Sequence, residues 1–416
     1  MRNLKRFAST AVAAGALFLG GCNDWLAVEN PNVIDNDALD PIADAVILAK
    51  SAQQNFASAY GHLVVYSSWF VGETDVSETF PTRNEFGRRD ITVQNASLDV
   101  DVWFPLSQSA SSAYLVLDAA LPNPNANINY ARVNLFLGFS YVFMAEQFCR
   151  GTVRSGPELA TLAMLDSAVA HFTLAISRGD AAGGEGLILA NAARVGLARA
   201  HLQAGRLPEA IAAANTVPAA FNYNLTFTDD LAQRFRLANR MWFYVRDRGS
   251  IAVAPIWRTA TSDTLRVPWL VTTAYAPQDA AYASDRGVPY AIQQKYRDYN
   301  IPVRLASKLE ADYITAEAQG TAAQLTLIDA RRAAFGQPAY SGATDANSVL
   351  TEFFTQKGFD FYLEGKRLGD FRRHPANIIG VPVPASTYWK PGFAPVSNNT
   401  CFPLPITEID NNPNLN

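Results

Sequence analysis

Small and apolar residues recur every three or four positions along much of this chain, which is the spacing of one face of an α-helix. The pattern predicts helices over residues 41–60, 100–121, 130–148, 164–178, 187–218, 305–335 and 348–373. Residues 76–98 lack this pattern and contain Pro81, Gly87 and three arginines, so we predict a loop there. The expected fold class is therefore all-α.

Residues 187–218 contain the clearest internal signal, two alanine-rich helices on either side of a glycine turn. The hairpin follows the spacing of a tetratricopeptide unit in Leu197-Ala198, His201, Gly205 and Glu209-Ala210-Ile211. The match is partial, because His201 replaces the usual aromatic residue and Ala214 the usual bulky one. One hairpin cannot bury its own apolar face, so we expect residues 164–178 and 304–335 to stack on it in a tetratricopeptide-like superhelix.

Residues 222–299 differ in composition from the helical parts. Prolines, threonines and aromatic residues replace the alanine periodicity, which predicts a loop-rich insertion with short strands at most. The helical body then covers residues 41–221 and 300–416, with an irregular tail after Pro375. Nearly 400 residues exceed a single typical core, so the chain needs either two domains or a repeat array.

The N-terminus has the composition of an export signal. A basic segment is followed by an apolar run, Ala11–Leu19, whose nine residues would rise only about 14 Å as a helix, too short to cross a bilayer core of about 30 Å. This indicates a signal peptide over residues 1–21. The sequence Leu19-Gly20-Gly21-Cys22 resembles a bacterial lipobox, in which Cys22 carries the lipid; the alternative is an ordinary signal peptide with an incidental cysteine.

Residues 22–40 are rich in Asn, Asp and Pro and are predicted to be a tether between the lipid and the folded body. No second apolar run approaches 18 residues, so we expect membrane contact through the lipid alone. Loss of residues 1–21 removes three positive charges and changes the formal net charge from −4 to −7. An acidic chain without a block of basic residues argues against a nucleic-acid partner.

Two cysteines remain after Cys22, namely Cys149 and Cys401. An oxidising envelope permits a disulfide between them, and we predict one; two free thiols are the alternative.

Catalytic and metal-binding signatures are absent from the sequence. It contains no G-x-S-x-G, H-E-x-x-H, P-loop or C-x-x-C motif, and its four histidines are scattered. The best carboxylate pair is Glu364 and Asp370, which on one helix would lie about 120° apart and so would not face one cleft. Contacts of each with Arg367 at i,i+3 are the expected arrangement. We therefore expect no enzyme activity, no cofactor and no metal site.

Two C-terminal segments resemble the SusD/RagB family of nutrient-uptake outer-membrane lipoproteins. Residues 361–373 read FYLEGKRLGDFRR, similar to the family's "E-G-x-R-x-x-D-L/F-x-R" segment. Residues 402–415 read FPLPITEIDNNPNL, similar to its closing "F-P-I-P-x-x-E-I-x-x-N-P-x-L". Residues 311–335 and Asn30-Pro31-Asn32 agree more loosely. One departure is that the arginines usual before the "E-G" segment are absent, with Lys357 the only nearby base.

The resemblance implies an α-helical fold built on tetratricopeptide-like hairpins with a loop-rich layer. It also implies a surface-exposed, lipid-anchored protein of the outer membrane, which captures a glycan such as starch, or a peptide, and delivers it to a SusC-like TonB-dependent transporter. Two other functions are weighed against capture: a protein–protein scaffold of an envelope complex, and a lipid-anchored polysaccharide hydrolase.

A sugar-capture site should combine aromatic rings with Arg, Asn or Gln on exposed loops. Two segments have this composition, and their candidate ligand-binding residues are Arg83, Phe86 and Arg88 in the first and Trp269, Tyr275 and Tyr282 in the second. We expect the two segments to approach each other on the face away from the helical stack. The alternative is that these rings pack the insertion against the helices, as we expect Trp69, Phe70 and Trp103 to pack in the core.

Overall fold

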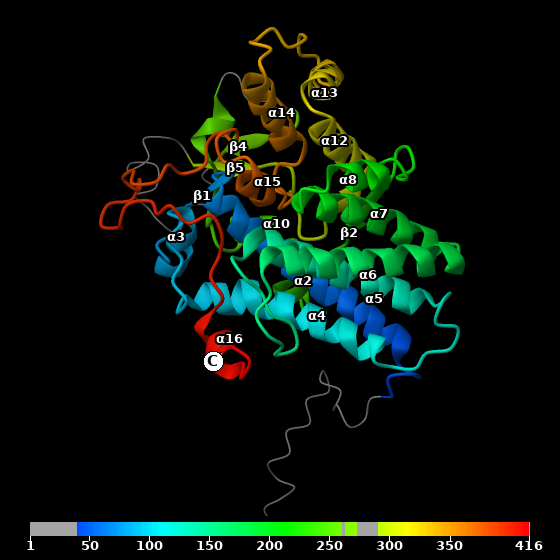
Figure 1. Cartoon of the computed structure of the whole chain (residues 1–416). Coiled ribbons are helices and arrows are strands. Elements are labelled where there is room, and N and C mark those ends of the chain that lie inside the picture. The colour runs from blue at the N-terminus through cyan, green and yellow to red at the C-terminus, as the bar shows by residue number, and fades with distance from the viewer. Residues whose placement is uncertain (1–39, 260–262, 273–289, 416) are drawn as a thin grey trace, which may run out of the picture. The chain divides into compact units, whose positions relative to one another are not determined.

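The computed structural model describes residues 40–259, 263–272 and 290–415. Residues 41–416 form one compact unit, which is mainly helical, so the predicted all-α class is confirmed (Figure 1). Its longer helices are α2 (Ala45–Phe70), α4 (Phe104–Leu117), α5 (Ile128–Gln147), α6 (Thr161–Ala182), α7 (Glu185–Gln203), α12 (Lys308–Gln319), α13 (Thr321–Ala334) and α14 (Ala346–Asp360).

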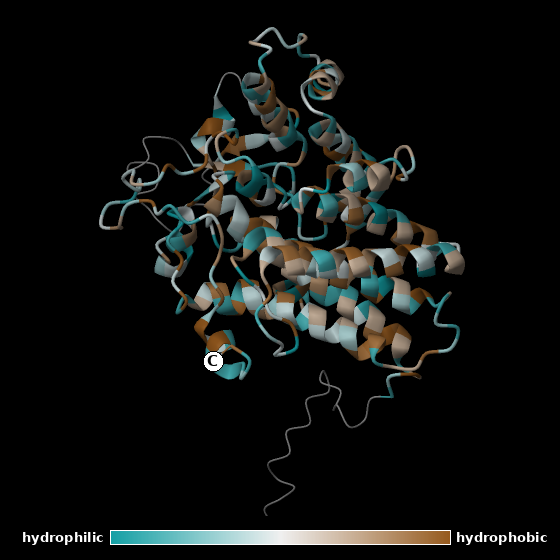
Figure 2. Ribbon diagram, in the orientation of Figure 1, coloured by the Kyte–Doolittle hydropathy of each residue, from teal (hydrophilic) through white to brown (hydrophobic). Residues whose placement is uncertain are grey.

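Most helices of this unit pack on a helix close to them in the chain. Helix α2 packs against α4 and α5, α5 against α6, α6 against α7, and α7 against α8 (Leu207–Ala214). The series continues through α12, which contacts α8, and then through α13 and α14. Apolar and polar residues are mixed along these helices (Figure 2), and most of them bury one side against their neighbours. The result is the predicted superhelix of helical hairpins.

The α7–α8 hairpin follows the predicted tetratricopeptide pattern. Gly205 makes the turn with a φ of +73°, a conformation that residues with a side chain rarely adopt. Buried alanines on α7 and α8 allow the two helices to approach closely. Both predicted neighbours lie where expected, because α6 packs on α7 and α12 packs on α7 and α8.

Helix α5 lies at the centre of the body and is buried on all sides. Every residue from Asn129 to Gln147 is buried. The side chain of Asn127 caps the helix by accepting a hydrogen bond from the Asn129 backbone N–H. A helix with no exposed face has no polar stripe that would show which side faces solvent. The sequence therefore predicts that this helix is present, but not that it lies at the centre of the body.

The insertion contains helices that the sequence did not predict. Residues 222–299 were expected to form short strands at most, but α9 (Arg234–Leu237) and α10 (Arg240–Arg246) are helical. Residues 241–245 are all buried, so α10 has no amphipathic period that would reveal it. Its start is marked by Asn239, whose side chain accepts from the Trp242 N–H. A 3-10 turn, η3, covers Pro255–Arg258.

Two short antiparallel strand pairs among the described residues connect the insertion to the helical body, and a third lies within the insertion. Strand β1 (Thr74–Val76) pairs with β3 (Ile251–Val253), with Asp75 opposite Ala252. Strand β2 (Asn222–Leu225) pairs with β6 (Val303–Ser307), and β4 (Trp269–Val271) pairs with β5 (Ala291–Gln293). The β1–β3 pair therefore places residues that follow α2 next to residues of the insertion.

Two predicted boundaries are wrong. Residues 76–98 are not a continuous loop, since α3 (Pro81–Gly87) lies within them and a π-helical turn, η2, begins at Leu98 (Leu98–Trp103). Residues 348–373 are not one helix, because α14 ends at Asp360 and α15 (Arg367–Arg373) starts after a turn. In that turn Leu363 and Gly365 have positive φ values of 55° and 65°, which no continuous α-helix accepts.

The break between α14 and α15 changes the partners of the carboxylates. Glu364 binds Lys295 and Arg304, at 2.7 and 2.8 Å, rather than Arg367. Asp370 binds Lys357 and Arg373, each at 2.7 Å. The expected i,i+3 contacts with Arg367 are therefore wrong.

The C-terminal tail is joined to the end of α5. Cys149 and Cys401 form a disulfide with a Cα–Cα distance of 5.1 Å, and Phe148 and Phe402 lie in a parallel β-bridge beside it. The tail then ends in a short helix, α16 (Ile406–Asn411), where an irregular segment was expected. Among the described residues, no helix is both long enough and apolar enough to cross a membrane.

Candidate functional site

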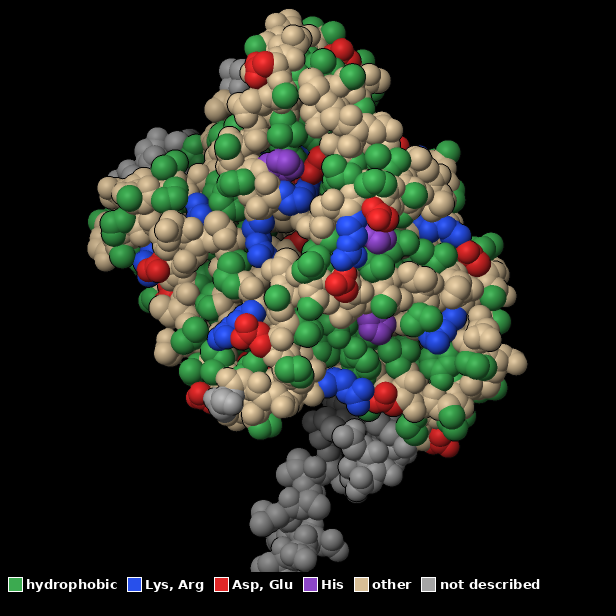
Figure 3. All heavy atoms as spheres, viewed as in Figure 1, with side chains coloured by type: hydrophobic (Ala, Val, Ile, Leu, Met, Phe, Trp, Pro, Cys, Tyr) green, Lys and Arg blue, Asp and Glu red, His purple; other side chains and the backbone are tan. Residues whose placement is uncertain are grey.

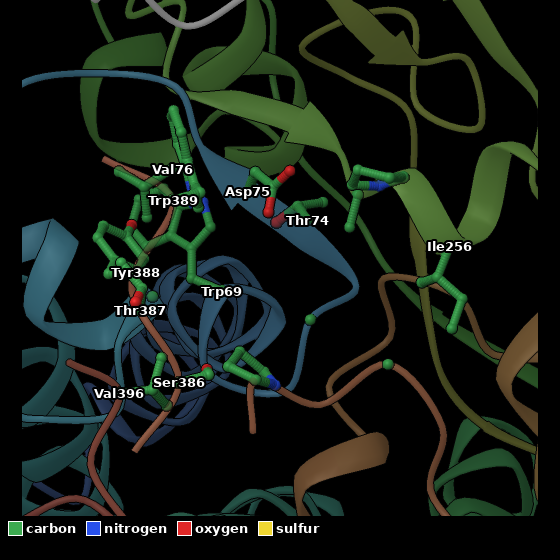
Figure 4. A pocket seen from close by; sticks show the side chains of 16 residues that line it. Trp69, Thr74, Asp75, Val76, Ile256, Ser386, Thr387, Tyr388, Trp389 and Val396 are labelled. Atoms are coloured by element: carbon green, nitrogen blue, oxygen red, sulfur yellow. The ribbon is translucent and has the colours of Figure 1, made fainter. Parts of the chain in front are cut away.

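A cavity of about 440 Å³ lies beside the β1–β3 strand pair, within the range of about 300–1,000 Å³ that is typical of small-ligand sites. Five parts of the chain surround it: the end of α2, strand β1, Gly87 at the end of α3, residues 254–256 after β3, and the tail between residues 380 and 396. Figure 4 shows labelled side chains from four of them. None of these parts belongs to the α7–α8 repeat. The walls of the cavity therefore come from helix ends, a short strand and irregular segments.

Glycines allow the tail to approach the end of α2. A Cβ atom on Gly72 would lie 2.1 Å from the carbonyl oxygen of Gly380, and Gly72 also has a φ of +70°. A side chain at position 72 would therefore force the tail away. On the facing wall, a Cβ on Gly87 would lie 2.7 Å from the Tyr388 hydroxyl. The sequence thus allows backbone and side chains to meet closely around the cavity.

Aromatic rings gather at one end of the cavity. Figure 4 shows Trp69, Tyr388 and Trp389 grouped there, with Ile256 at the opposite end. The Tyr388 hydroxyl donates to Asn84 Oδ1 at 3.0 Å, which fixes its ring, and the Trp389 ring lies 5.8 Å from it. Lys390 Nζ lies 4.8 Å from the Trp389 ring centroid. Trp389 is the partly exposed member of this group.

The indole N–H of Trp69 is an unsatisfied donor. The side chain is 1% exposed, and its Nε1 has no hydrogen-bond partner among the described residues. Its ring packs edge-on against Tyr66 with a centroid distance of 4.9 Å. A buried polar group without a partner costs free energy, on the order of 1–3 kcal/mol.

Polar groups lie next to the rings. The Asp75 carboxylate and the Thr74 hydroxyl are on the strand beside them (Figure 4), and Ser386 and Thr387 add hydroxyls from the tail. Ring faces with a few hydrogen-bonding groups match a sugar, which presents C–H faces and hydroxyls. Across the described residues, no group of three His, Cys, Asp or Glu side chains could hold a metal ion.

Two predicted ligand-binding residues lie in the interior. Arg83 is 7% exposed and makes two hydrogen bonds to Glu78, at 2.8 and 2.9 Å. Phe86 is fully buried, with its ring against Tyr66 and Phe402. The expectation that both stand on an exposed loop is therefore wrong, because α3 turns these side chains inward.

The other predicted residues differ in position. Arg88 follows α3, is partly buried and pairs with Asp90. Trp269 is partly buried on β4, and its Nε1 has no hydrogen-bond partner among the described residues. Neither side chain lines the cavity that contains Trp69, Tyr388 and Trp389, which we call the aromatic cavity. Tyr275 and Tyr282, like Cys22, lie outside the described residues.

Two aromatic residues of the cavity, Tyr388 and Trp389, are not among those predicted from the sequence. The reason is that residues after Pro375 show no periodicity. Two adjacent large aromatics within a segment rich in proline and glycine are a signal that could have identified them, since an irregular segment has little core of its own to hold such rings. Trp69 was correctly predicted to be buried, but its contact with the cavity was not predicted.

The fold and the cavity together define a helical-repeat protein with a small-ligand cavity built from the connections between its repeats. No family model matches the sequence, and no curated protein matches it either. Solved structures do match. A SusD superfamily protein from Parabacteroides distasonis is 13% identical, with a TM-score of 0.65 over 91% of this chain and 99% of that one.

Two further structures match over most of their length. The surface glycan-binding protein A from Bacteroides uniformis is 14% identical, with a TM-score of 0.61 over 88% of this chain and 98% of that one. A laminarin-binding SusD-like protein is 12% identical, with a TM-score of 0.61 over 88% and 97%. The chain therefore has the SusD-superfamily fold, as the two C-terminal segments predicted.

Proposed function

We propose that this protein is a SusD/RagB-type surface lipoprotein that binds a glycan in the aromatic cavity. In this proposal Cys22 carries the lipid that holds it on the outer membrane, and a SusC-like TonB-dependent transporter receives the glycan. The observation that carries the proposal is the grouping of three aromatic residues, Trp69, Tyr388 and Trp389, at one end of the cavity.

Two further facts support glycan binding. Proteins with the same fold include a laminarin-binding SusD-like protein and a surface glycan-binding protein. The cavity wall also combines aromatic faces with hydroxyl and carboxylate groups, which can engage a sugar ring and its hydroxyls together. Peptide remains the alternative ligand within this function.

The test compares two partly buried tryptophans. Trp389→Ala removes a ring from the cavity, whereas Trp269→Ala removes one from β4, outside it. Isothermal titration calorimetry with a panel of neutral oligosaccharides, including laminarin fragments, should show Trp389→Ala losing about 1–3 kcal/mol of binding free energy, the usual contribution of stacking on an aromatic ring. The Trp269→Ala variant should bind as the unmodified protein does.

If instead Trp269→Ala weakens binding and Trp389→Ala does not, the ligand binds at the insertion, as predicted from the sequence, and contacts Trp269. Binding of no glycan would instead favour the scaffold function. Turnover of any bound glycan, measured by the release of reducing ends, would favour the hydrolase.

A further inference from the structure

A second cavity, also of about 440 Å³, lies between β2, β6 and helices α13 and α14. Six of the residues that line it are charged. Four of them are basic (Arg266, Lys295, Arg304 and Arg331) and two are acidic (Asp360 and Glu364). Asp263, which pairs with Arg266 at 2.7 Å, adds a third acid nearby. The surroundings of this cavity are therefore net positive, in a chain whose formal net charge is −4.

On the face that Figure 3 shows, basic and acidic side chains often lie next to each other. At the second cavity two cations share each carboxylate, as Lys357 and Arg373 share Asp370 elsewhere. Asp360 binds Arg331 at 2.8 Å and Arg266 at 3.2 Å, and Glu364 binds Lys295 and Arg304.

Two of the three guanidinium groups at this cavity have one nitrogen without a hydrogen bond to the described residues. Arg331 and Arg304 use Nε and Nη2 for their hydrogen bonds, which leaves Nη1. Arg266 uses Nε and Nη2 on Asp263 and Gln356, its Nη1 lies 3.2 Å from Asp360 Oδ1, and its side chain is only 3% exposed, so it holds the two carboxylates and is not available to a ligand.

The exposure of the cations indicates which of them can meet a ligand. The side chains of Lys295, Arg304 and Arg331 are each 20–23% exposed, so their heads are reachable from solvent. Asp360 and Glu364 are each 2% exposed and lie behind them. An incoming anion therefore meets the basic groups first.

We infer that this second cavity binds a carboxylate group of an acidic glycan, such as a uronic acid. Guanidinium groups bind carboxylates with short, charge-assisted hydrogen bonds, and the unused Nη1 nitrogens of Arg304 and Arg331 supply the donors. The exposed amides of Asn222 and Asn224 lie on the same cavity and can bond to sugar hydroxyls. The nature of the ligand rests on the proposed glycan-binding function, but the site does not share residues with the aromatic cavity.

The first test uses two neighbouring arginines of α13. Arg331 lines the cavity; Arg332 does not, yet it forms a comparable ion pair, with Glu352 at 2.7 Å and a side-chain exposure of 21%. In calorimetry on the full chain, Arg331→Gln should weaken trigalacturonate binding about 10- to 100-fold, as expected for the loss of a hydrogen bond to a charged group. Arg332→Gln should leave it unchanged, and a neutral galactose trisaccharide should bind at least tenfold more weakly than trigalacturonate.

Arg331→Gln could impair folding, because Asp360 is buried. Asn224→Asp avoids this difficulty, since it places a negative charge on an exposed position at the cavity. It should also weaken trigalacturonate binding, by repulsion, and the effect should shrink as salt is added.

Equal binding of trigalacturonate by the unmodified protein, Arg331→Gln and Asn224→Asp would overturn the inference, as would tight binding of inorganic phosphate without binding of trigalacturonate. The two proposals fail separately. If Trp389→Ala loses trigalacturonate binding and Arg331→Gln does not, the result supports the aromatic cavity as the binding site and contradicts the second site. The opposite result supports the second site and contradicts the aromatic cavity.

Discussion

Glu73 is a buried carboxylate that lies between the aromatic cavity and the turn after α14. Its Oε1 accepts a hydrogen bond from the Leu363 N–H at 3.1 Å, while Oε2 has no partner among the described residues. Burial raises the pKa of Glu73 from its ordinary value to about 7, with Arg367 nearby opposing the rise. The neutral form is therefore favoured in the folded protein over much of the acidic range.

The raised pKa predicts a pH-dependent cost of folding. Because the folded state holds the proton more tightly than the unfolded chain, the contribution of Glu73 to stability is largest below about pH 4.5 and is lost as the pH rises to about 7. Glu73→Gln keeps the acceptor for Leu363 and removes the titration. In urea unfolding, this variant should gain stability relative to the unmodified protein between pH 5 and pH 8, by up to about 3 kcal/mol.

A pH-independent difference between Glu73→Gln and the unmodified protein would contradict this account. Glu209, an exposed carboxylate on α8, provides the control. Glu209→Gln should change the free energy of unfolding little at either pH, because the carboxylate remains in water in both states.

At the scale of the elements, one ring connects three helices. Phe172 of α6 lies against glycines of both neighbouring helices. A Cβ on Gly196 of α7 would be 2.3 Å from the ring, and a Cβ on Gly138 of α5 would be 2.7 Å from it. The packing of α5, α6 and α7 therefore depends on the absence of side chains at these two positions.

Gly196→Ala should destabilise the protein by about 1–3 kcal/mol, although alanine is the better helix former, because the methyl group overpacks the contact. Urea unfolding measures the change. Phe172→Leu shortens the side chain, so Gly196→Ala should cost less in that background. Additive costs of the two substitutions would show that the ring and the glycine do not interact.

Some elements can be predicted from a single sequence and others cannot. The α7–α8 hairpin could be predicted because its pattern is local: buried alanines at helical spacing and Gly205 at the turn. Helix α10 could not, because tertiary contacts bury its run of five apolar residues on every side. The turn at Leu363 and Gly365 was missed because the periodicity of residues 348–373 continues across it, and only the backbone conformation reveals the break.

The cavities depend on contacts between distant parts of the chain, which local patterns do not contain. Arg83 and Phe86 have the composition of a sugar site, yet Glu78 and Phe402 hold them inside. Trp389 reaches its place only because the tail returns to α2, more than 300 residues earlier. The sequence therefore predicted the fold better than it predicted the residues that line the cavities.

At the scale of the whole molecule, the Cys149–Cys401 disulfide holds the tail against α5. It links residues 252 positions apart, and the tail segment just before Cys401 forms one wall of the aromatic cavity. Closing so long a loop restricts the unfolded chain, and this stabilises the folded state by about 5 kcal/mol at most. The same link limits how far the wall that carries Trp389 can move.

The paired substitution Cys149→Ser with Cys401→Ser should therefore lower stability by up to about 5 kcal/mol in urea unfolding, and weaken binding in the aromatic cavity more than in the second cavity. The reason for the difference is that residues 380–396 line the first and none of them lines the second. Thiol labelling of the denatured, unreduced protein checks the premise. Two labelled thiols, in addition to any from Cys22, would show that the bond is absent and that the tail is held by packing alone.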